Sequence, residues 1–251
     1  MTQDARQIAA VTFNYKTPDL IQQAVKWFKR LYPRNPLMII DDGSRDGSTE
    51  TALDLAGDYP ATEAVILDQN IGQGRCFHFA TQVMGYRGYR YVFFFDSDIV
   101  FRAGGFLEVL LEWMVQDRLY AIGWHHPCDR GNPIVCTAFA LLDLDQYNQL
   151  PPYTHGPNPS VPNMEAALRR GMGIQIVDID GWAYHITSGT SGSLPRQYFS
   201  APGGDSTREP WDQCGPGQVD VNALIDQYKK IEEQGVTVSS HLRFLTVKQD
   251  G

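Results

Sequence analysis

The first hundred residues alternate short apolar runs with segments of helical periodicity, and this alternation limits the possible folds more than any other feature of the sequence. Apolar runs stand at residues 8–13, 37–40, 64–67 and 91–95. Between the first two runs, over residues 18–31, apolar residues recur every three or four positions, as on one face of an amphipathic helix. Strands that alternate with helices form βαβ units, so the sequence predicts an α/β fold with a doubly wound sheet.

Composition excludes several classes of protein. The chain has 251 residues, with 21 Lys and Arg against 29 Asp and Glu, and a formal net charge of −8. This leaves no basic surplus to neutralise a nucleic-acid backbone, which disfavours a general DNA- or RNA-binding role. No apolar run approaches the roughly 18 residues of a membrane span. The first four residues are too polar for a signal peptide. The four cysteines form no CxxC pair. We therefore expect a reduced cytoplasmic protein without a membrane span.

The rhythm of the sequence changes after residue 100. The later elements that the sequence predicts are a helix at 105–115, strands at 119–123 and 134–142, a helix at 163–170, strands at 174–177 and 182–186, and a helix at 221–231. The segment 187–219 is rich in Ser, Gly and Pro, and we expect a long loop that orders over a bound substrate. We expect one domain at 1–186, with the loop and C-terminal helix of 187–251 packed on it.

Two carboxylates follow the most apolar of the predicted strands. Three phenylalanines at 93–95 run directly into Asp96-Ser97-Asp98. Two carboxylates this close repel each other unless a cation, hydrogen-bond donors or water compensate them, and their hard oxygen atoms suit Mg²⁺ or Mn²⁺. An isolated D-x-D is more often a solvated turn, but its place after a buried strand favours the metal interpretation.

The other predicted strands also end in polar residues. Thr12-Phe13-Asn14 ends the first strand, Asp41-Asp42-Gly43-Ser44 follows the second, and Asn70-Ile71-Gly72 follows the third. Ligands of doubly wound sheets bind outside the carboxyl ends of the strands, so these segments predict a binding site. Taken alone, the segment at 41–44 could equally be a turn before a helix capped by Asp46.

The four segments, in this order, resemble the motifs of glycosyltransferase family 2. The similar stretches are Val11-Thr12-Phe13-Asn14, Ile39-Ile40-Asp41-Asp42-Gly43-Ser44, Asn70-Ile71-Gly72-Gln73-Gly74 and Phe95-Asp96-Ser97-Asp98. The resemblance covers residues 8 to about 100 well and the rest loosely. It implies the GT-A fold, a Rossmann-like doubly wound mixed sheet, with a nucleotide-sugar-binding half at 1–100 and an acceptor half at 101–186.

The resemblance also implies ligands and residue roles. The donor would be a UDP-, GDP- or dTDP-linked sugar, and the cofactor Mn²⁺ or Mg²⁺. Asp42 would accept the N–H of the base, Asp96 would hold the ribose, and Asp98 would coordinate the metal, with His185 as a further ligand. The nucleotide-sugar contacts that the resemblance implies are Thr12, Phe13, Asn14, Asp42, Asn70, Arg75, Asp96 and Ser97.

The catalytic base departs from the family pattern. The family has an acidic Glu-Asp-x-Asp segment before Leu and Arg, and alignment on Arg169 puts Asn163 where the catalytic Asp is expected. This leaves Glu165 as the candidate base, with Asp178 and Asp180 as weaker ones. As an alternative, Glu165 is an ordinary first-turn glutamate of a helix.

The sequence thus favours a metal-dependent inverting glycosyltransferase with an unidentified hydroxyl acceptor. Trp124-His125-His126-Pro127 is a candidate acceptor wall because aromatic faces stack on sugars, although packing inside the protein explains it as well. A nucleotidyltransferase is one alternative, but it would need a Gly-rich basic loop after the first strand, and residues 14–17 contain no glycine. A catalytically silent nucleotide-sugar-binding protein is another, and Asn163 is its best support.

Overall fold

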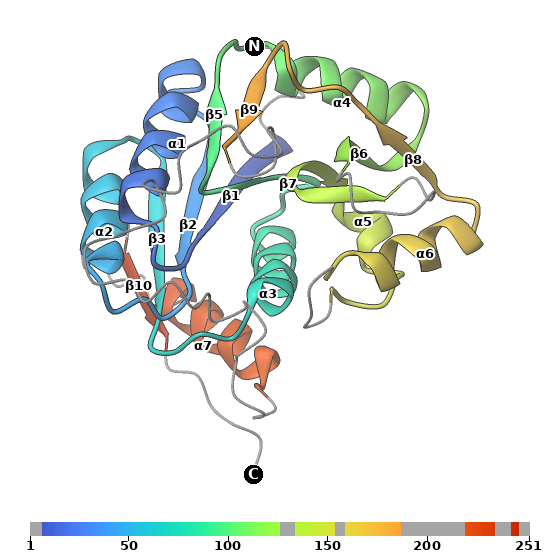
Figure 1. Cartoon of the computed structure of the whole chain (residues 1–251). Helices are drawn as coiled ribbons and strands as arrows, with labels where there is room; N and C mark the ends of the chain where they lie inside the picture. Colours follow the sequence, from blue (N-terminus) through green and yellow to red (C-terminus); the bar gives the residue numbers. More distant parts are fainter. Residues whose placement is uncertain (1–6, 126–133, 154–158, 187–218, 234–241, 246–251) are drawn as a thin grey trace, which may run out of the picture.

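A mixed sheet of eight strands, in the order β10-β3-β2-β1-β4-β7-β6-β8, forms the centre of the fold (Figure 1). The computed structural model describes residues 7–125, 134–153, 159–186, 219–233 and 242–245. The strands of the sheet are β1 (Ile8–Asn14), β2 (Leu37–Asp41), β3 (Thr62–Leu67), β4 (Tyr91–Asp96), β6 (Leu119–His125), β7 (Val135–Asp143), β8 (Gly173–Ile176) and β10 (Leu242–Leu245).

The first half of the sheet is parallel, as the sequence predicts. β1 lies between β2 and β4, with Val11 opposite Met38 on one side and Phe94 on the other. The connecting helices are α1 (Pro18–Leu31), α2 (Ser48–Asp58) and α3 (Gln73–Tyr86). Pro18 opens α1 at a position where its missing N–H costs nothing. Parallel strands put their carboxyl ends at one edge, so the motif residues that follow β1, β2, β3 and β4 gather there.

The second half makes the sheet mixed. β7 runs antiparallel to both β4 and β6, and β8 runs parallel to β6. The strand predicted at 182–186 is present as β9 (Ala183–His185), but it pairs with β5 (Ile99–Phe101) in a separate two-stranded sheet instead of the main one. The remaining helices are α4 (Phe106–Gln116), α5 (Leu144–Tyr147), α6 (Val161–Arg169) and α7 (Val221–Glu233).

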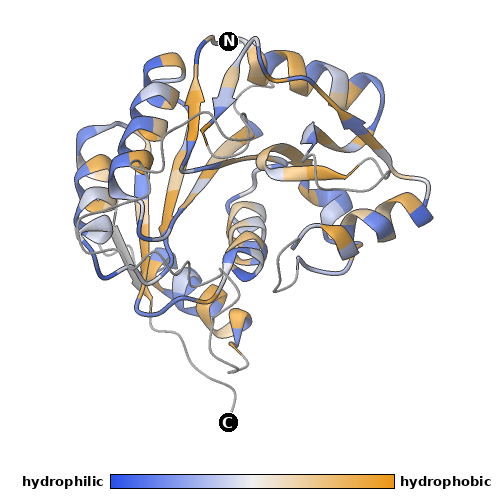
Figure 2. Ribbon diagram, in the orientation of Figure 1, coloured by the Kyte–Doolittle hydropathy of each residue, from blue (hydrophilic) through white to orange (hydrophobic). Residues whose placement is uncertain are grey.

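Both faces of the sheet are covered, so the strands are hydrophobic on both sides (Figure 2). Successive residues of β4 point to opposite faces: Phe94 packs edge-on against Phe77 of α3, whereas Phe93 packs edge-on against Phe139 on the other side. On that second side Phe28 of α1 stacks on Phe95. Rings on both faces therefore hold β4 in place and fix the position of the carboxylates at its end.

The C-terminal part extends the parallel half of the sheet. α7 packs on α3, and β10 adds a parallel edge strand beside β3. The predicted C-terminal helix is thus confirmed, while β10 was not predicted. Of the expected loop over 187–219, residues 187–218 lie outside the described part of the chain. No helix among the described residues is long and apolar enough to cross a membrane.

Candidate active site

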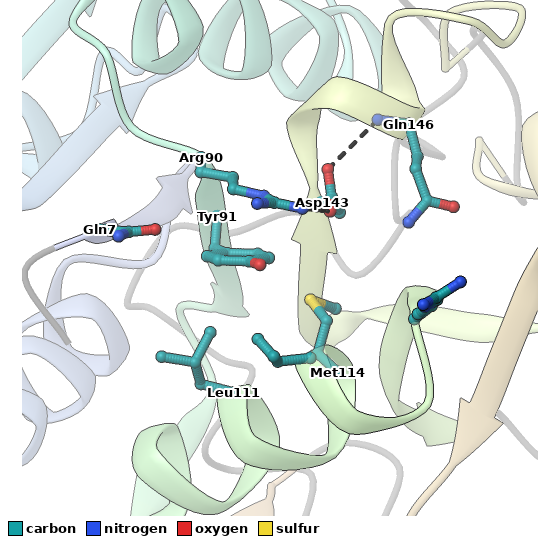
Figure 3. Close-up of a pocket in the computed structure, with 9 residues that line it drawn as sticks. Gln7, Arg90, Tyr91, Leu111, Met114, Asp143 and Gln146 are labelled. Atoms are coloured by element: carbon teal, nitrogen blue, oxygen red, sulfur yellow. Dashed lines mark hydrogen bonds and ion pairs between the residues drawn. The ribbon is translucent and has the colours of Figure 1, made fainter. Parts of the chain in front are cut away.

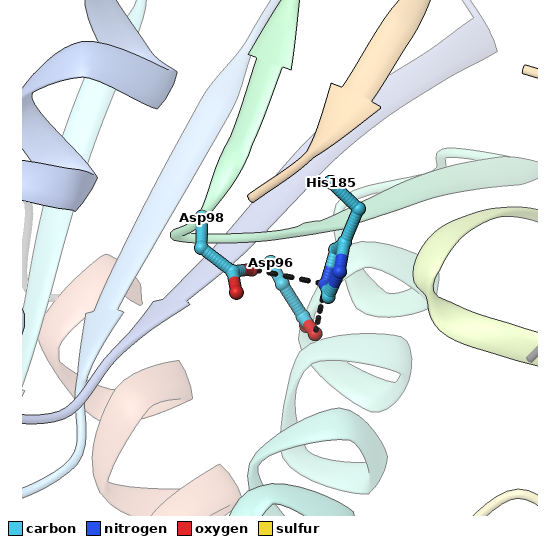
Figure 4. A group of neighbouring side chains, drawn as sticks. All are labelled: Asp96, Asp98 and His185. Atoms are coloured by element: carbon cyan, nitrogen blue, oxygen red, sulfur yellow. Dashed lines mark ion pairs between the residues drawn. The ribbon is translucent and has the colours of Figure 1, made fainter. Parts of the chain in front are cut away.

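Three side chains of the types that ligate metal ions, together called the metal-ligating cluster here, converge at the carboxyl end of β4 (Figure 4). Asp96 is the last residue of β4, Asp98 stands in the turn that leads into β5, and His185 ends β9. The β5–β9 pair places His185 opposite Ile99, and Ile186 N–H donates to the carbonyl of Asp98 at 3.0 Å. This ladder brings a histidine that stands 87 positions after Asp98 to the D-x-D turn.

The side chains are close enough to share one ion. His185 Nε2 lies 3.1 Å from Asp98 Oδ1 and 3.9 Å from Asp96 Oδ2, and one ligand atom from each residue lies within 4.8 Å of the other two. Neighbouring ligands of an octahedral Mg²⁺ at about 2.1 Å lie about 3 Å apart. Two carboxylates and one imidazole also form a donor set that suits Mn²⁺. The residues present therefore fit a divalent cation.

The three ionisable side chains of the cluster are largely shielded from solvent. His185 is buried, and the side chains of Asp96 and Asp98 are 25% and 14% exposed. Burial by itself lowers the pKa of His185, but hydrogen bonds and charges from Asp96 and Asp98 outweigh it and raise the pKa to about 9. Two carboxylates here thus require a positive partner, which either a protonated imidazole or a divalent cation supplies.

Two polar contacts tie the cluster to neighbouring elements. Gln73, the first residue of α3, donates from Nε2 to Asp96 Oδ1 at 3.0 Å and leaves Oδ2 toward His185. The Ser97 hydroxyl lies 3.0 Å from the Thr17 hydroxyl, which donates to Asn14 Oδ1 at 2.8 Å. Gln73 was missed in the sequence analysis, although it stands inside the Asn70–Gly74 motif.

The side chains at the end of β1 are engaged within the protein. Thr12 and Phe13 are buried, and the Phe13 ring packs against Phe77 and Phe94. Asn14 Nδ2 donates to Asp41 Oδ1 at 3.0 Å. The resemblance assigns Thr12 and the main chain of residues 13 and 14 to the nucleoside pocket, and this assignment stays a prediction.

Asp42 has partners inside the protein. It is buried, and its two carboxylate oxygens accept hydrogen bonds from the N–H groups of Ile71 at 2.7 Å and Gly72 at 3.0 Å. Burial raises the pKa of Asp42 to about 7, and the two hydrogen bonds partly oppose that rise. Gly43 has a φ of +70°, and a Cβ there would overlap the main chain of Gln69. The carboxylate that the resemblance assigns to the base therefore anchors the loop after β3.

The remaining donor candidates lie on or beside that loop. Asn70 is half-buried, and Arg75 Nη1 donates to the carbonyl of Ile71 at 3.2 Å. Two side chains link the neighbouring segments to the D-x-D turn. Gln73, which follows the loop after β3, hydrogen-bonds Asp96, and Thr17, which follows β1, contacts Ser97.

The structure separates the candidate bases from the metal-ligating cluster. Asn163 is buried: it accepts a hydrogen bond from the Tyr120 hydroxyl and donates to the carbonyl of Pro151 at 2.6 Å. Glu165 is 42% exposed and forms an ion pair with Arg169 at 3.5 Å. Asp178 Oδ1 accepts from the N–H of Asp180 at 2.9 Å, and both are exposed. The metal-ligating group found among the described residues does not include any of these.

The segment proposed as an acceptor wall is described in part. The Trp124 ring lies next to His185, with 5.2 Å between ring centroids. His125 Nδ1 lies 3.1 Å from the carbonyl of Ile134, a contact within the protein. His126 and Pro127 lie outside the described residues.

A cavity of about 490 Å³ lies at the opposite end of β4 (Figure 3). Its lining residues are Gln7, Arg90, Tyr91, Leu111, Met114, Val115, Arg118, Asp143 and Gln146. Tyr91 begins β4 and Asp96 ends it, so about 17 Å of strand separates the cavity from the metal-ligating cluster. The cavity contains none of the motif residues.

Comparisons with known proteins bear on the family and the fold of the chain. The sequence matches the family model described as glycosyl transferase family 2 over residues 8–135. A comparison with curated proteins finds no match.

Solved structures share the fold at low sequence identity. The mannosyltransferase PcManGT from Pyrobaculum calidifontis, in complex with GDP-Man and Mn²⁺, is 17% identical with a TM-score of 0.57, over 68% of this chain and 54% of that chain. S. aureus TarS 1-349 is 13% identical with a TM-score of 0.54, over 71% and 60%. Glucosyl-3-phosphoglycerate synthase from Mycobacterium tuberculosis, in complex with Mn²⁺, UDP and phosphoglyceric acid, is 16% identical with a TM-score of 0.51, over 72% and 70%.

These likenesses bear on the fold alone. This chain spans between about half and three fifths of the length of the first two structures. The expected GT-A arrangement of the α/β sheet is confirmed by them. Since residues 8–135 make up more than half of the sequence, the chain belongs to glycosyl transferase family 2.

Proposed function

We propose that this chain is a metal-dependent, inverting glycosyltransferase that moves a sugar from a nucleoside-diphosphate sugar to a hydroxyl acceptor. The observation that carries the proposal is the meeting of Asp96, Asp98 and His185 at the carboxyl edge of the sheet. PcManGT was solved with GDP-Man and Mn²⁺, and the mycobacterial synthase with UDP and Mn²⁺, which supports a donor and a cation of these classes. Family membership favours glycosyl transfer over nucleotidyl transfer.

The cluster residues have distinct parts in this proposal. Asp98 and His185 hold the cation, and Asp96 lies near enough to share it while Gln73 fixes its other oxygen. A divalent cation bound there supplies the positive charge that stabilises a departing diphosphate. The N-terminus of α3, which begins at Gln73, adds the partial positive charge of the helix dipole beside the same site.

The nucleotide-sugar contacts remain those of the family resemblance. The proposed contacts are Thr12, Phe13, Asn14, Asp42, Asn70, Arg75, Asp96 and Ser97. Asp42 can contact the nucleotide base only if the base reaches its carboxylate. The N–H groups of Ile71 and Gly72 then either move away or share the carboxylate with the base. We also retain residues 1–100 as the nucleotide half, 101–186 as the acceptor half, and 187–251 as a loop and helix on the same domain.

The base is proposed to be Glu165. Inversion by direct displacement requires a group that takes the proton of the acceptor hydroxyl, and the amide of Asn163 cannot do so. Glu165 is a carboxylate two positions further along α6, and its only partner among the described residues is Arg169. An exposed ion pair spaced i,i+4 contributes only about 0.3–0.5 kcal/mol, so Glu165 can leave Arg169 at little cost.

Asn163 favours a second candidate function, that of a nucleotide-sugar-binding protein without transfer. The buried hydrogen bonds of Asn163 to Tyr120 and Pro151 give the amide a structural purpose of its own. Such a protein would bind donor and Mn²⁺ but would not release nucleoside diphosphate.

One experiment separates these functions. Release of nucleoside diphosphate from UDP-, GDP- and dTDP-linked sugars is measured with Mn²⁺ and a panel of hydroxyl acceptors, for wild type, Asp98→Ala and Glu165→Gln. Asp117→Ala removes an exposed carboxylate after α4 and serves as the matched control. We expect release by wild type and by the control, and loss in both other variants. Binding of donor without release in wild type would favour the silent protein, and an active Glu165→Gln would remove Glu165 as the base.

A further inference from the structure

An indole ring packs against the histidine of the metal-ligating cluster. The rings of Trp124 and His185 are tilted by 39° with centroids 5.2 Å apart. His185 is buried, whereas Trp124 is partly exposed. Trp124 comes from β6 of the main sheet and His185 from β9 of the small sheet, so this contact joins the two sheets beside the proposed cation site.

The pairing of β6 with β7 is irregular at Trp124. The register between β6 and β7 shifts between Gly123 and His125, on either side of Trp124. Gly123 lies so close to β7 that a Cβ would overlap the carbonyl of Phe139, and only glycine fits there. Trp124 alone separates the paired residues Gly123 and His125 on β6, whereas residues 136–139 separate their partners Ala140 and Val135 on β7, so the extra residues of this irregularity lie in β7. The position of Trp124 is therefore built into the pairing of two sheet strands.

The main chain around His185 does not by itself fix the imidazole. β9 has three residues and its described partner strand is β5, which sets the position of the His185 Cα. The ring still has two rotatable bonds. His185 Nε2 faces Asp96 and Asp98, so a rotation of the imidazole about its side-chain bonds would point this nitrogen away from both carboxylates. The indole ring, tilted by 39° against the imidazole, opposes that rotation by contact.

We propose that Trp124 is a positioning residue for His185, holding the imidazole with Nε2 toward Asp96 and Asp98 before the cation arrives. The inference rests on the proposed function, because that function supplies the cation. Trp124 itself has no part in binding the ion. Groups that orient metal ligands commonly change metal affinity by about 10- to 100-fold when they are removed. Pre-orientation matters here because His185 ends a strand of three residues that pairs with β5 outside the main sheet.

Direct measurement of Mn²⁺ affinity tests the proposal without relying on catalysis. Free Mn²⁺ is counted by electron paramagnetic resonance in titrations of wild type, Trp124→Leu and Trp124→Phe, with no nucleotide present. Trp113→Leu is the matched control, since Trp113 packs on Trp182 instead of His185. We expect Trp124→Leu to weaken Mn²⁺ binding by about 10- to 100-fold, Trp124→Phe to restore most of the affinity, and the control to bind as wild type does. If wild type binds Mn²⁺ and Trp124→Leu binds it with equal affinity, the proposal is overturned.

A second readout separates this proposal from the proposed function. Crystal structures of metal-free wild type and Trp124→Leu report the distance from His185 Nε2 to Asp98 Oδ1, which is 3.1 Å with the indole in place. We expect the ring to turn away in Trp124→Leu. A wild type that binds no Mn²⁺ while the ring turns in the variant would reject the metal-dependent function and keep the positioning role. A ring that stays in place in Trp124→Leu would reject the positioning role whatever the wild type binds. If Trp124→Leu does not fold, Trp124→Phe is compared with Trp124→Met on the same two measurements.

Discussion

The hydroxyl of Tyr228 donates a 3.0 Å hydrogen bond to Glu63 Oε2, across 165 positions of sequence. The same carboxylate accepts two hydrogen bonds from the guanidinium of Arg87, which also reaches Glu232 at 3.0 Å and lies 5.1 Å from the centre of the Tyr228 ring. Glu63 belongs to β3, Arg87 follows α3, and Tyr228 belongs to α7. The network therefore fastens the C-terminal helix α7 to β3 and to the end of α3.

Removing Arg87 should destabilise the protein more than removing the Tyr228 hydroxyl. Arg87→Leu leaves the buried Glu63 carboxylate without its cation, which costs about 3–5 kcal/mol. Tyr228→Phe leaves the ion pair and removes one hydrogen bond to a charged group, at about 1.5–3 kcal/mol. Urea unfolding measures both, with Arg169→Ala, which breaks only an exposed pair, as the control. The reverse order of the two losses would contradict this account of the network.

Asp42→Asn should destabilise the loop at residues 69–72 although the substitution keeps the shape of the side chain. The carboxylate offers one oxygen to each of two N–H donors, those of Ile71 and Gly72. An amide offers one oxygen and sets its own N–H₂ group against the second donor, so one buried donor loses its partner at about 1–3 kcal/mol. Urea unfolding together with amide hydrogen exchange at residues 71 and 72 measures this loss. Unchanged protection of both amides in the variant would contradict the anchoring role of Asp42.

Much of this architecture could be predicted from local patterns. The apolar runs at β1, β2 and β4 and the periodicity of α1 identify a parallel sheet, because long buried strands and amphipathic helices leave strong signals in sequence. β5 and β10 were not predicted. β5 has three residues and β10 four, and each depends on a partner far away in sequence, so neither has a pattern of its own.

The sequence predicted which types of residue make up the candidate site, but only some of the contacts between them. Asp98 and His185 were expected to bind metal, and their side chains do meet. Asp96 was assigned to the ribose, but it lies within the same group. The burial of Asp42 beneath a loop was unexpected, because an aspartate at a strand end looks alike whether it faces a ligand or a loop. Gly43 was the signal, since its left-handed backbone lets the loop approach.

The buried Lys29 should make stability rise with pH in the alkaline range. Its Nζ donates to the carbonyl of Asn35 at 2.8 Å, and burial lowers the pKa of Lys29 to about 8, against 10.5 for an unburied lysine. Between pH 8 and 10.5 the unfolded chain holds the proton that the folded protein has released. The free energy of unfolding therefore rises through this window, by up to about 3 kcal/mol, and the destabilisation is complete below pH 8.

Lys29→Met isolates this effect from the other groups that titrate at alkaline pH. Urea unfolding of wild type and variant is compared from pH 7 to 10.5, and the difference between the two curves reports Lys29 alone. We expect wild type to gain stability relative to the variant as pH rises. Parallel curves would show that the Lys29 ammonium retains its ordinary pKa inside the protein.

Mn²⁺ should stabilise the wild-type protein against unfolding, and Asp98→Asn should abolish this effect. A ligand that binds only the folded state raises its stability by RT ln(1 + [L]/Kd), or about 2.7 kcal/mol at 100 times Kd. Asp98→Asn keeps the size of the side chain but removes the carboxylate 3.1 Å from His185 Nε2, so it takes away a charged ligand without opening a void. Thermal unfolding with Mn²⁺ and with EDTA measures the shift, and Asp117→Asn, an exposed position, controls for the loss of charge. A shift in Asp98→Asn as large as in wild type would place the Mn²⁺ site elsewhere on the chain.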